Sequence, residues 1–136
     1  MRTRSELREI AMKSLYQILV IRKTNLEYSV DEIIKENIEE ENEFVNELVK
    51  GSLDKEKEIV DLSNKYLDGW TIDRLNLVDQ AILMLSVYEL TYTETPSIVV
   101  INEWVELSKK YSDDAVTKMI NAVLDSIYHS EDKYGK

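Results

Sequence analysis

The longest apolar pattern in the chain predicts a buried central helix over about residues 72–92. Apolar residues there recur at steps of three and four, which places them on one face of a helix. They are Leu75, Val78, Ile82, Leu85 and Tyr88. Several residues outside that face are apolar too, and a helix that is apolar nearly all round is buried by other helices. We therefore expect the rest of the fold to pack around this segment.

A proline separates this segment from a second predicted helix. Pro96 disfavours helix in the residue before it and suits the first position of the next helix. The following pattern is amphipathic to about Lys110, with Trp104 on the apolar face and Glu103 on the polar face. We expect a helix pair joined by a short connection.

Apolar periodicity predicts the remaining helices. The first runs over about residues 4–21, the second over 30–38, and a long third one from Phe44 to Leu67. Gly51 either interrupts this third helix or packs closely against a neighbour. Trp70, just after a helix-ending glycine, is expected to pack back on the last turn. Ser112, Asp113 and Asp114 supply capping oxygens for a final helix.

These patterns predict an all-α fold of about seven helices and no strand. The length of 136 residues favours a single domain over residues 1–136, with a polar tail from about 129. The chain contains no cysteine, which excludes disulfides, zinc–thiolate sites and a thiol nucleophile. No apolar run suits a membrane span or a signal peptide, so we expect no membrane association and a cytoplasmic protein.

Charge is distributed unevenly along the chain. The net charge is −10, but six basic and two acidic residues give residues 1–23 a charge of +4, which leaves −14 for the remainder. The basic residues are Arg2, Arg4, Arg8, Lys13, Arg22 and Lys23. Phosphate affinity depends on local lysine and arginine, so this end is a candidate interaction surface.

One strip of the first helix combines cations with an aromatic ring. Arg8, Tyr16 and Lys23 lie on it, and Arg4 lies at its edge. Arginine contacts phosphate and tyrosine offers a stacking face, which suits a flexible RNA strand. The alternative is that the arginines are a solvated helix start and that Tyr16 is a residue at the edge of the core. The acidic segment over residues 36–43 is either a solvated turn or a surface that repels RNA.

Catalytic chemistry finds little support in the sequence. The single histidine, His129, stands in the polar tail, and no phosphate-binding glycine motif is present. Glu103 and Glu106 have the spacing of helical metal ligands, but no histidine follows at the matching place. We predict a protein that is not an enzyme and uses no cofactor or metal.

Several segments together resemble the NusB transcription antitermination family. They are REIAMKSLYQ, FVNELVKGS, RLNLVDQAIL, VVINEWVELSKKYSDD and VLD. The likeness covers about residues 4–127. It implies two small packed helical subdomains that bind the boxA element of nascent RNA together with NusE, a small-subunit ribosomal protein. Such a protein would join the RNA polymerase antitermination complex and help it read through terminators, notably in ribosomal RNA operons.

The resemblance also implies which residues form the binding sites. Arg4 and Arg8 match the family's arginine-rich helix start, with Arg2 nearby, and are expected to contact RNA. Tyr16 matches a tyrosine at the junction of the RNA and NusE surfaces. Asp79 matches an acidic residue that faces NusE in the family, although an acid near a helix N-terminus also suits the macrodipole.

The fit near the C-terminus is poorer. Lys118 and Met119 stand at RNA-facing positions, but Met119 replaces the family's usual phenylalanine and stacks less well on bases. Trp104 occupies a position where alanine is usual. With fewer arginines at the helix start as well, we expect RNA binding that is weaker, or more dependent on NusE, than in a more basic relative.

Other functions stay open at this point. The acidic body is also typical of a helical adaptor that binds only protein partners. Domains of this kind occur fused to RNA cytosine methyltransferases, but this sequence shows no second domain and no cysteine for that chemistry. Some relatives form homodimers, and the sequence leaves that possibility open for this chain.

Overall fold

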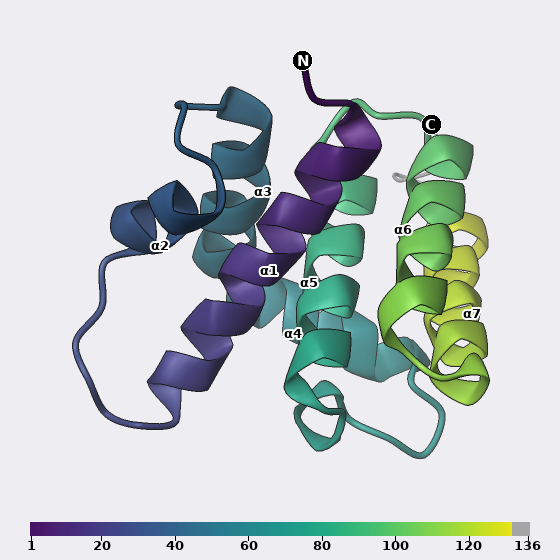
Figure 1. The fold of residues 1–136 in the computed structure, drawn as a ribbon. Helices are drawn as coiled ribbons and strands as arrows, with labels where there is room; N and C mark the ends of the chain where they lie inside the picture. Colours follow the sequence, from purple (N-terminus) through teal and green to yellow (C-terminus); the bar gives the residue numbers. More distant parts are fainter. Residues whose placement is uncertain (132–136) are drawn as a thin grey trace.

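The helices follow the apolar periodicity closely. The computed structural model describes residues 1–131, which contain seven α-helices, one 3₁₀ turn and no strand, so the predicted all-α class is confirmed (Figure 1). In chain order they are α1 (Arg4–Arg22), α2 (Val30–Asn37), α3 (Glu43–Asp54), α4 (Glu56–Tyr66), the 3₁₀ turn η1 (Ile72–Arg74), α5 (Leu77–Tyr92), α6 (Ser97–Tyr111) and α7 (Asp114–Ser130). None of these helices is long and apolar enough to cross a bilayer.

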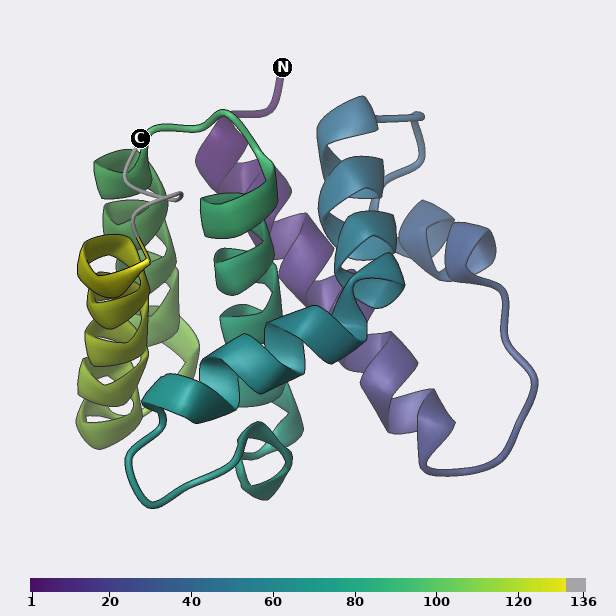
Figure 2. The same cartoon turned by 180° about the vertical axis from the view of Figure 1, so that it is seen from behind.

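Helix α5 is the centre of the fold, as its sequence predicts. Every residue from Ala81 to Leu90 is buried, and α1, α3, α4, α6 and α7 all pack against the helix. Helices α1–α3 gather on one side of the molecule and α5–α7 on the other, and α4 runs across between them from the end of α3 toward α7 (Figures 1 and 2). The packing of α1 on α5 joins the two groups, which places the start of the chain beside the core.

Side-chain caps define several helix starts. Thr3 and Glu6 form a reciprocal capping box at α1, in which each side chain accepts a hydrogen bond from the other residue's backbone N–H. Asp113 accepts the backbone N–H of Val116 and caps α7, as predicted. Asn76 caps α5 in the same way, so this helix begins at Leu77 rather than at Ile72.

The long third helix is in fact two helices. The helix is interrupted at Lys55, between α3 and α4, whereas Gly51 lies within α3. A Cβ atom at Gly51 would lie 2.2 Å from the ring of Tyr88 on α5, so the second interpretation of this glycine, close packing, is confirmed. Glycine here lets α3 approach α5 closely.

Two predictions about the ends of helices are wrong. Trp70 is not buried against the last turn of α4, because it is 47% exposed and the Arg74 guanidinium lies 5.0 Å from its ring. Helix α7 continues to Ser130, so His129 belongs to a helix rather than to a polar tail. Glu131 is the C-cap of that helix, and residues 132–136 of the predicted tail lie outside the described residues.

Candidate nucleic-acid interface

The N-terminal end of α1 presents the two exposed arginines of the predicted RNA surface. Arg2 and Arg4 are exposed on either side of the capping residue Thr3. The guanidinium carbon of Arg4 lies 4.0 Å from the centroid of the Phe44 ring on α3, which is within the range of a cation–π interaction. Arg4 is therefore accessible, and its guanidinium also has a packing partner.

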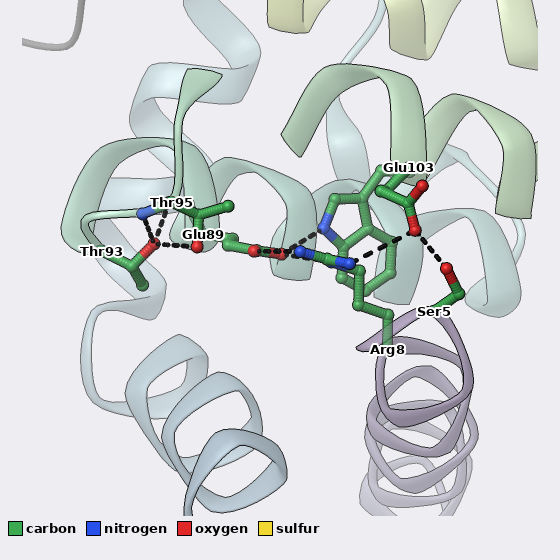
Figure 3. A network of polar contacts seen from close by, with 7 residues as sticks. Ser5, Arg8, Glu89, Thr93, Thr95 and Glu103 are labelled. Atoms are coloured by element: carbon green, nitrogen blue, oxygen red, sulfur yellow. Dashed lines mark hydrogen bonds and ion pairs between the residues drawn. The ribbon is translucent and has the colours of Figure 1, made fainter. Parts of the chain in front are cut away.

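Arg8 requires a correction. It was predicted to contact RNA, but it is only 3% exposed. Its Nη2 and Nε atoms donate to the two carboxylate oxygens of Glu89 at 2.7 and 2.9 Å, and its Nη1 lies 3.4 Å from Glu103 (Figure 3). A bidentate pair of this kind satisfies the guanidinium inside the protein. We assign Arg8 a structural role, because its donors face the interior and not the solvent.

Glu89 on α5 is the residue that the sequence reasoning missed. It is fully buried and also accepts a hydrogen bond from Trp104 Nε1 at 2.8 Å. Burial raises the pKa of this carboxyl, but the Arg8 guanidinium and the Trp104 N–H outweigh burial, and the pKa lies below its ordinary value. The signal was available in the sequence, because an acid in the middle of an apolar run requires a buried cation or donor.

An apolar groove runs between α1, the start of α5 and the end of α6. Its volume is about 630 Å³. It is lined by Met12, Lys13, Tyr16, Gln17, Asn76, Leu77, Val78 and Tyr111. Tyr16 is 40% exposed and lines this groove, so its side chain is accessible to solvent there. The groove combines apolar walls with one cation, a composition that suits a protein segment better than a phosphate chain.

Asp79 follows the groove residues Leu77 and Val78 in the first turn of α5. It was predicted to face a protein partner, but it is only 2% exposed, and its carboxylate accepts a hydrogen bond from the Ser112 hydroxyl. This bond ties α5 to the turn between α6 and α7. The predicted direct contact is corrected for the same reason as that of Arg8, because the side chain is not accessible.

Replacing Asp79 with asparagine should make the free energy of unfolding change less with pH above about pH 4. Burial, opposed by the Ser112 hydrogen bond, raises the pKa of Asp79 above its ordinary value of 3.8. A raised pKa means that the contribution of Asp79 to stability is fully present below pH 3.8 and is lost as the pH rises through the folded-state pKa. Asparagine carries no charge and still accepts from Ser112.

We expect Asp79→Asn to be at least as stable as the wild type at pH 7 and to show a flatter stability curve above pH 4. Urea denaturation at a series of pH values measures this. A variant curve that runs parallel to the wild-type curve throughout would contradict the assignment.

The two predicted RNA residues of α7 lie apart from the start of α1. Lys118 is exposed and Met119 is partly buried against the core. Helix α7 packs against α4, α5 and α6, and α6 stands between α7 and α1 (Figure 1). The structure thus places the accessible predicted residues in three separate regions: Arg2 and Arg4 at the N-terminal end of α1, Tyr16 at the groove, and Lys118 on α7.

Comparison with known proteins decides the family. The family model for NusB matches residues 5–129. The transcription antitermination protein NusB of Macrococcus caseolyticus is 41% identical over 127 residues, which cover 92% of this chain and 95% of that protein. This chain belongs to the NusB family. The resemblance seen in the sequence is thereby confirmed.

Solved structures agree with this result. NusB of T. maritima has a TM-score of 0.82 at 28% identity, with 100% of both chains covered. A structure of the antitermination factors NusB and NusE in complex with dsRNA has a TM-score of 0.78 at 31% identity. That match covers 96% of this chain and 98% of the other chain. The fold described above is therefore the NusB fold throughout.

Trp104 is where this NusB-family chain departs from the alanine that the resemblance leads one to expect. The side chain is fully buried, and its indole N–H donates to Glu89. The extra volume is thus accommodated inside the Arg8–Glu89 network and does not enlarge the outer surface. This departure changes the interior of the protein rather than its binding surfaces.

Proposed function

We propose that this chain is a transcription antitermination factor that binds boxA-type RNA jointly with NusE and helps RNA polymerase read through terminators, notably in ribosomal RNA operons. The observation that carries the proposal is the match, over 96% of the chain, to the NusB of a NusB–NusE–dsRNA complex. In this role the protein works in the cytoplasm as a scaffold and catalyses no reaction.

In this proposal, different exposed residues bind the RNA and the protein partner. Arg2 and Arg4 supply phosphate contacts at the N-terminal end of α1, where both side chains are exposed. The groove at Tyr16 receives NusE, and the acidic body, with a net charge of −10, favours a basic partner. Lys118 and Met119 on α7 form a separate candidate RNA contact, because α6 lies between α7 and α1 (Figure 1).

Fluorescence anisotropy with a boxA-like RNA tests this function. A scrambled RNA is the sequence control, and both RNAs are titrated with and without NusE across a salt series. We expect boxA to bind better than the scramble and NusE to tighten the binding. For a single strand, the slope of log K against log salt falls by about 0.7 for each phosphate contact, so the slope counts the contacts.

A charge-reversal pair shows whether the first turn of α1 is the RNA site. Arg2→Glu with Arg4→Glu should weaken RNA binding and reduce the salt slope. Arg22→Glu is the matched control, because Arg22 is an exposed arginine at the other end of α1 that pairs with Glu56. If the double variant and the Arg22→Glu control lost RNA affinity equally, the RNA site would lie elsewhere.

A protein-only adaptor is the second candidate, and one observation favours it. Burial of Arg8 leaves a thin cationic cluster at the start of α1, where Glu40 and Glu41 line the same hollow as Arg2, of about 490 Å³. If NusE binds but neither RNA binds in its presence, the adaptor is the better account.

Neutralising the acidic loop should strengthen RNA binding. Glu40 and Glu41 lie close to Arg2 and repel an approaching phosphate. Glu40→Gln with Glu41→Gln should raise RNA affinity by up to about fivefold per charge, because exposed charges interact by about 0.2–1 kcal/mol. The gain should shrink at high salt.

The matched control for this loop is Glu58→Gln, a change at an exposed acid on α4. It should alter RNA affinity less than the loop variant does. The same titrations measure both variants. An unchanged affinity in the loop variant at low salt would show that the loop does not screen Arg2.

A further inference from the structure

The Phe44 ring contacts both arginines of the α1 start. The guanidinium carbon of Arg4 lies 4.0 Å from the ring centroid, and that of Arg8 lies 5.4 Å away. Arg4 and Arg8 are four residues apart on α1, so their side chains leave the same face of the helix. Phe44 belongs to the first turn of α3 and is partly buried against the core. One ring thus links an exposed arginine to a buried one.

Polar contacts hold Arg8, the buried arginine beside the Phe44 ring, in one position. Arg8 is held by both oxygens of Glu89 and lies 3.4 Å from Glu103, which also accepts a hydrogen bond from the Ser5 hydroxyl (Figure 3). The ring of Phe44 therefore rests against the core and a guanidinium that makes three polar contacts. A ring supported in this way offers a stable surface to Arg4.

We propose that Phe44 is a positioning residue for RNA binding and holds the Arg4 guanidinium ready to receive a phosphate. The inference rests on the proposed function. A guanidinium that stacks on an aromatic face keeps its in-plane N–H donors available, and those donors match phosphate oxygens in pairs. An exposed arginine without a ring partner samples many rotamers, and binding must order it.

This arrangement also gives the buried Arg8 an indirect part in RNA binding. Arg8 touches no RNA in this geometry, but through Phe44 it supports the arginine that does. Of the two exposed arginines at this end of α1, Arg4 is the one whose guanidinium contacts a ring. Arg2 has no comparable ring contact among the described residues.

A double-mutant cycle with Phe44→Leu and Arg4→Ala tests the proposal through RNA affinity measured with NusE present. Leucine keeps an apolar side chain but removes the flat ring. We expect Phe44→Leu to weaken RNA binding by about three- to tenfold and Phe44→Tyr, which keeps the ring, to restore it. In the Arg4→Ala background, Phe44→Leu should cause no further loss.

A purely structural role for Phe44 gives a different pattern. Phe44→Leu would then reduce RNA affinity equally in both backgrounds, and that result would overturn the proposal. The salt slope adds a second readout, because Arg4→Ala should reduce it by about 0.7 for one lost phosphate contact. Thermal unfolding of each variant shows whether the fold is kept.

Arg4→Lys keeps the inference testable if Phe44→Leu does not fold. Lysine carries the same charge but has no flat face to stack on the ring. Arg4 is exposed, so the substitution leaves the core intact. Lysine should bind RNA several-fold more weakly than arginine at this position, and wild-type affinity in Arg4→Lys would overturn the proposal.

An NMR arm separates failure of this inference from failure of the proposed function. The Nε–Hε resonance of Arg4 in the free protein should show a ring-current shift that disappears in Phe44→Leu and persists in Phe44→Tyr. If the wild type lacks this shift, the positioning role is overturned whether or not RNA binds. If the shift is present but the wild type binds no RNA even with NusE, the proposed function fails and the role of Phe44 in it fails with it.

Discussion

Replacing Arg8 with alanine is expected to lower the free energy of unfolding by about 3–5 kcal/mol, because removing one partner of a buried ion pair leaves the other charge unpaired in the interior. Arg8 and Glu89 have exposed side-chain fractions of 4% and 0%, and two hydrogen bonds join them. Domains are stable by only about 5–15 kcal/mol in total. The loss would therefore remove a large part of the stability of the protein.

Denaturant unfolding at pH 7 measures this effect. Arg22→Ala is the matched control, because Arg22 pairs with Glu56 at 2.9 Å but both side chains are about one third exposed. Pairs in that environment contribute about 0–1 kcal/mol. If Arg8→Ala cost no more than Arg22→Ala, the buried network would not have the role assigned to it.

The same pair predicts a sensitivity to acid. The pKa of Glu89 lies below its ordinary value of 4.5, so its contribution to stability is present above pH 4.5 and is lost as the pH falls through the folded-state pKa. Arg8→Ala removes the cation that lowers this pKa. The variant should therefore lose less stability between pH 5 and pH 3 than the wild type does.

Replacing Trp104 with alanine should cost about 3–5 kcal/mol, the usual range for truncating a large buried aromatic residue. Trp104 is completely buried, so its loss leaves a cavity that the surrounding helices fill only in part. It also deprives Glu89 of the N–H donor that lies 2.8 Å from its carboxylate. The cavity and the lost hydrogen bond both lower the free energy of unfolding.

Trp104→Phe separates these two contributions. Phenylalanine keeps most of the volume but has no N–H donor, so Glu89 keeps its two hydrogen bonds from Arg8 and loses the one from the indole. We expect an intermediate loss of about 1–3 kcal/mol for the lost hydrogen bond and the smaller ring. Denaturant unfolding of the two variants gives the comparison. If Trp104→Phe were as unstable as Trp104→Ala, the hydrogen bond and not the volume would dominate.

Local patterns were enough to predict the helices but not the partner of Arg8. The steps of three and four that identify α1 and α5 depend on neighbours within a few residues. Arg8 and Glu89 are 81 residues apart, and only the packing of α1 on α5 brings them together. Helical periodicity placed Arg8 on a strip beside the buried face. For a residue on such a strip, the sequence alone does not show whether the side chain is buried or exposed.

Errors elsewhere have similar physical causes. The sequence left two interpretations of Gly51 open, and the close approach of Tyr88 decided between them. Trp70 was expected to cover the end of α4, but Arg74 provides a cation beside its ring. For Asp79 the position near the helix start was predicted correctly, whereas its burial depends on Ser112 in the distant turn between α6 and α7.

The tie between Arg8 and Glu89 has a consequence for the geometry of binding. Two parallel hydrogen bonds to one carboxylate fix the rotation of α1 about its own axis, because a turn of one residue would move Arg8 by about 100°. Arg4 and Tyr16 are twelve residues apart on the same helix, so they point about 120° apart around it and lie about 18 Å apart along it. The proposed RNA contact at Arg4 and the proposed partner groove at Tyr16 therefore keep a constant mutual orientation, so binding of one ligand would not require the helix to turn before the other binds.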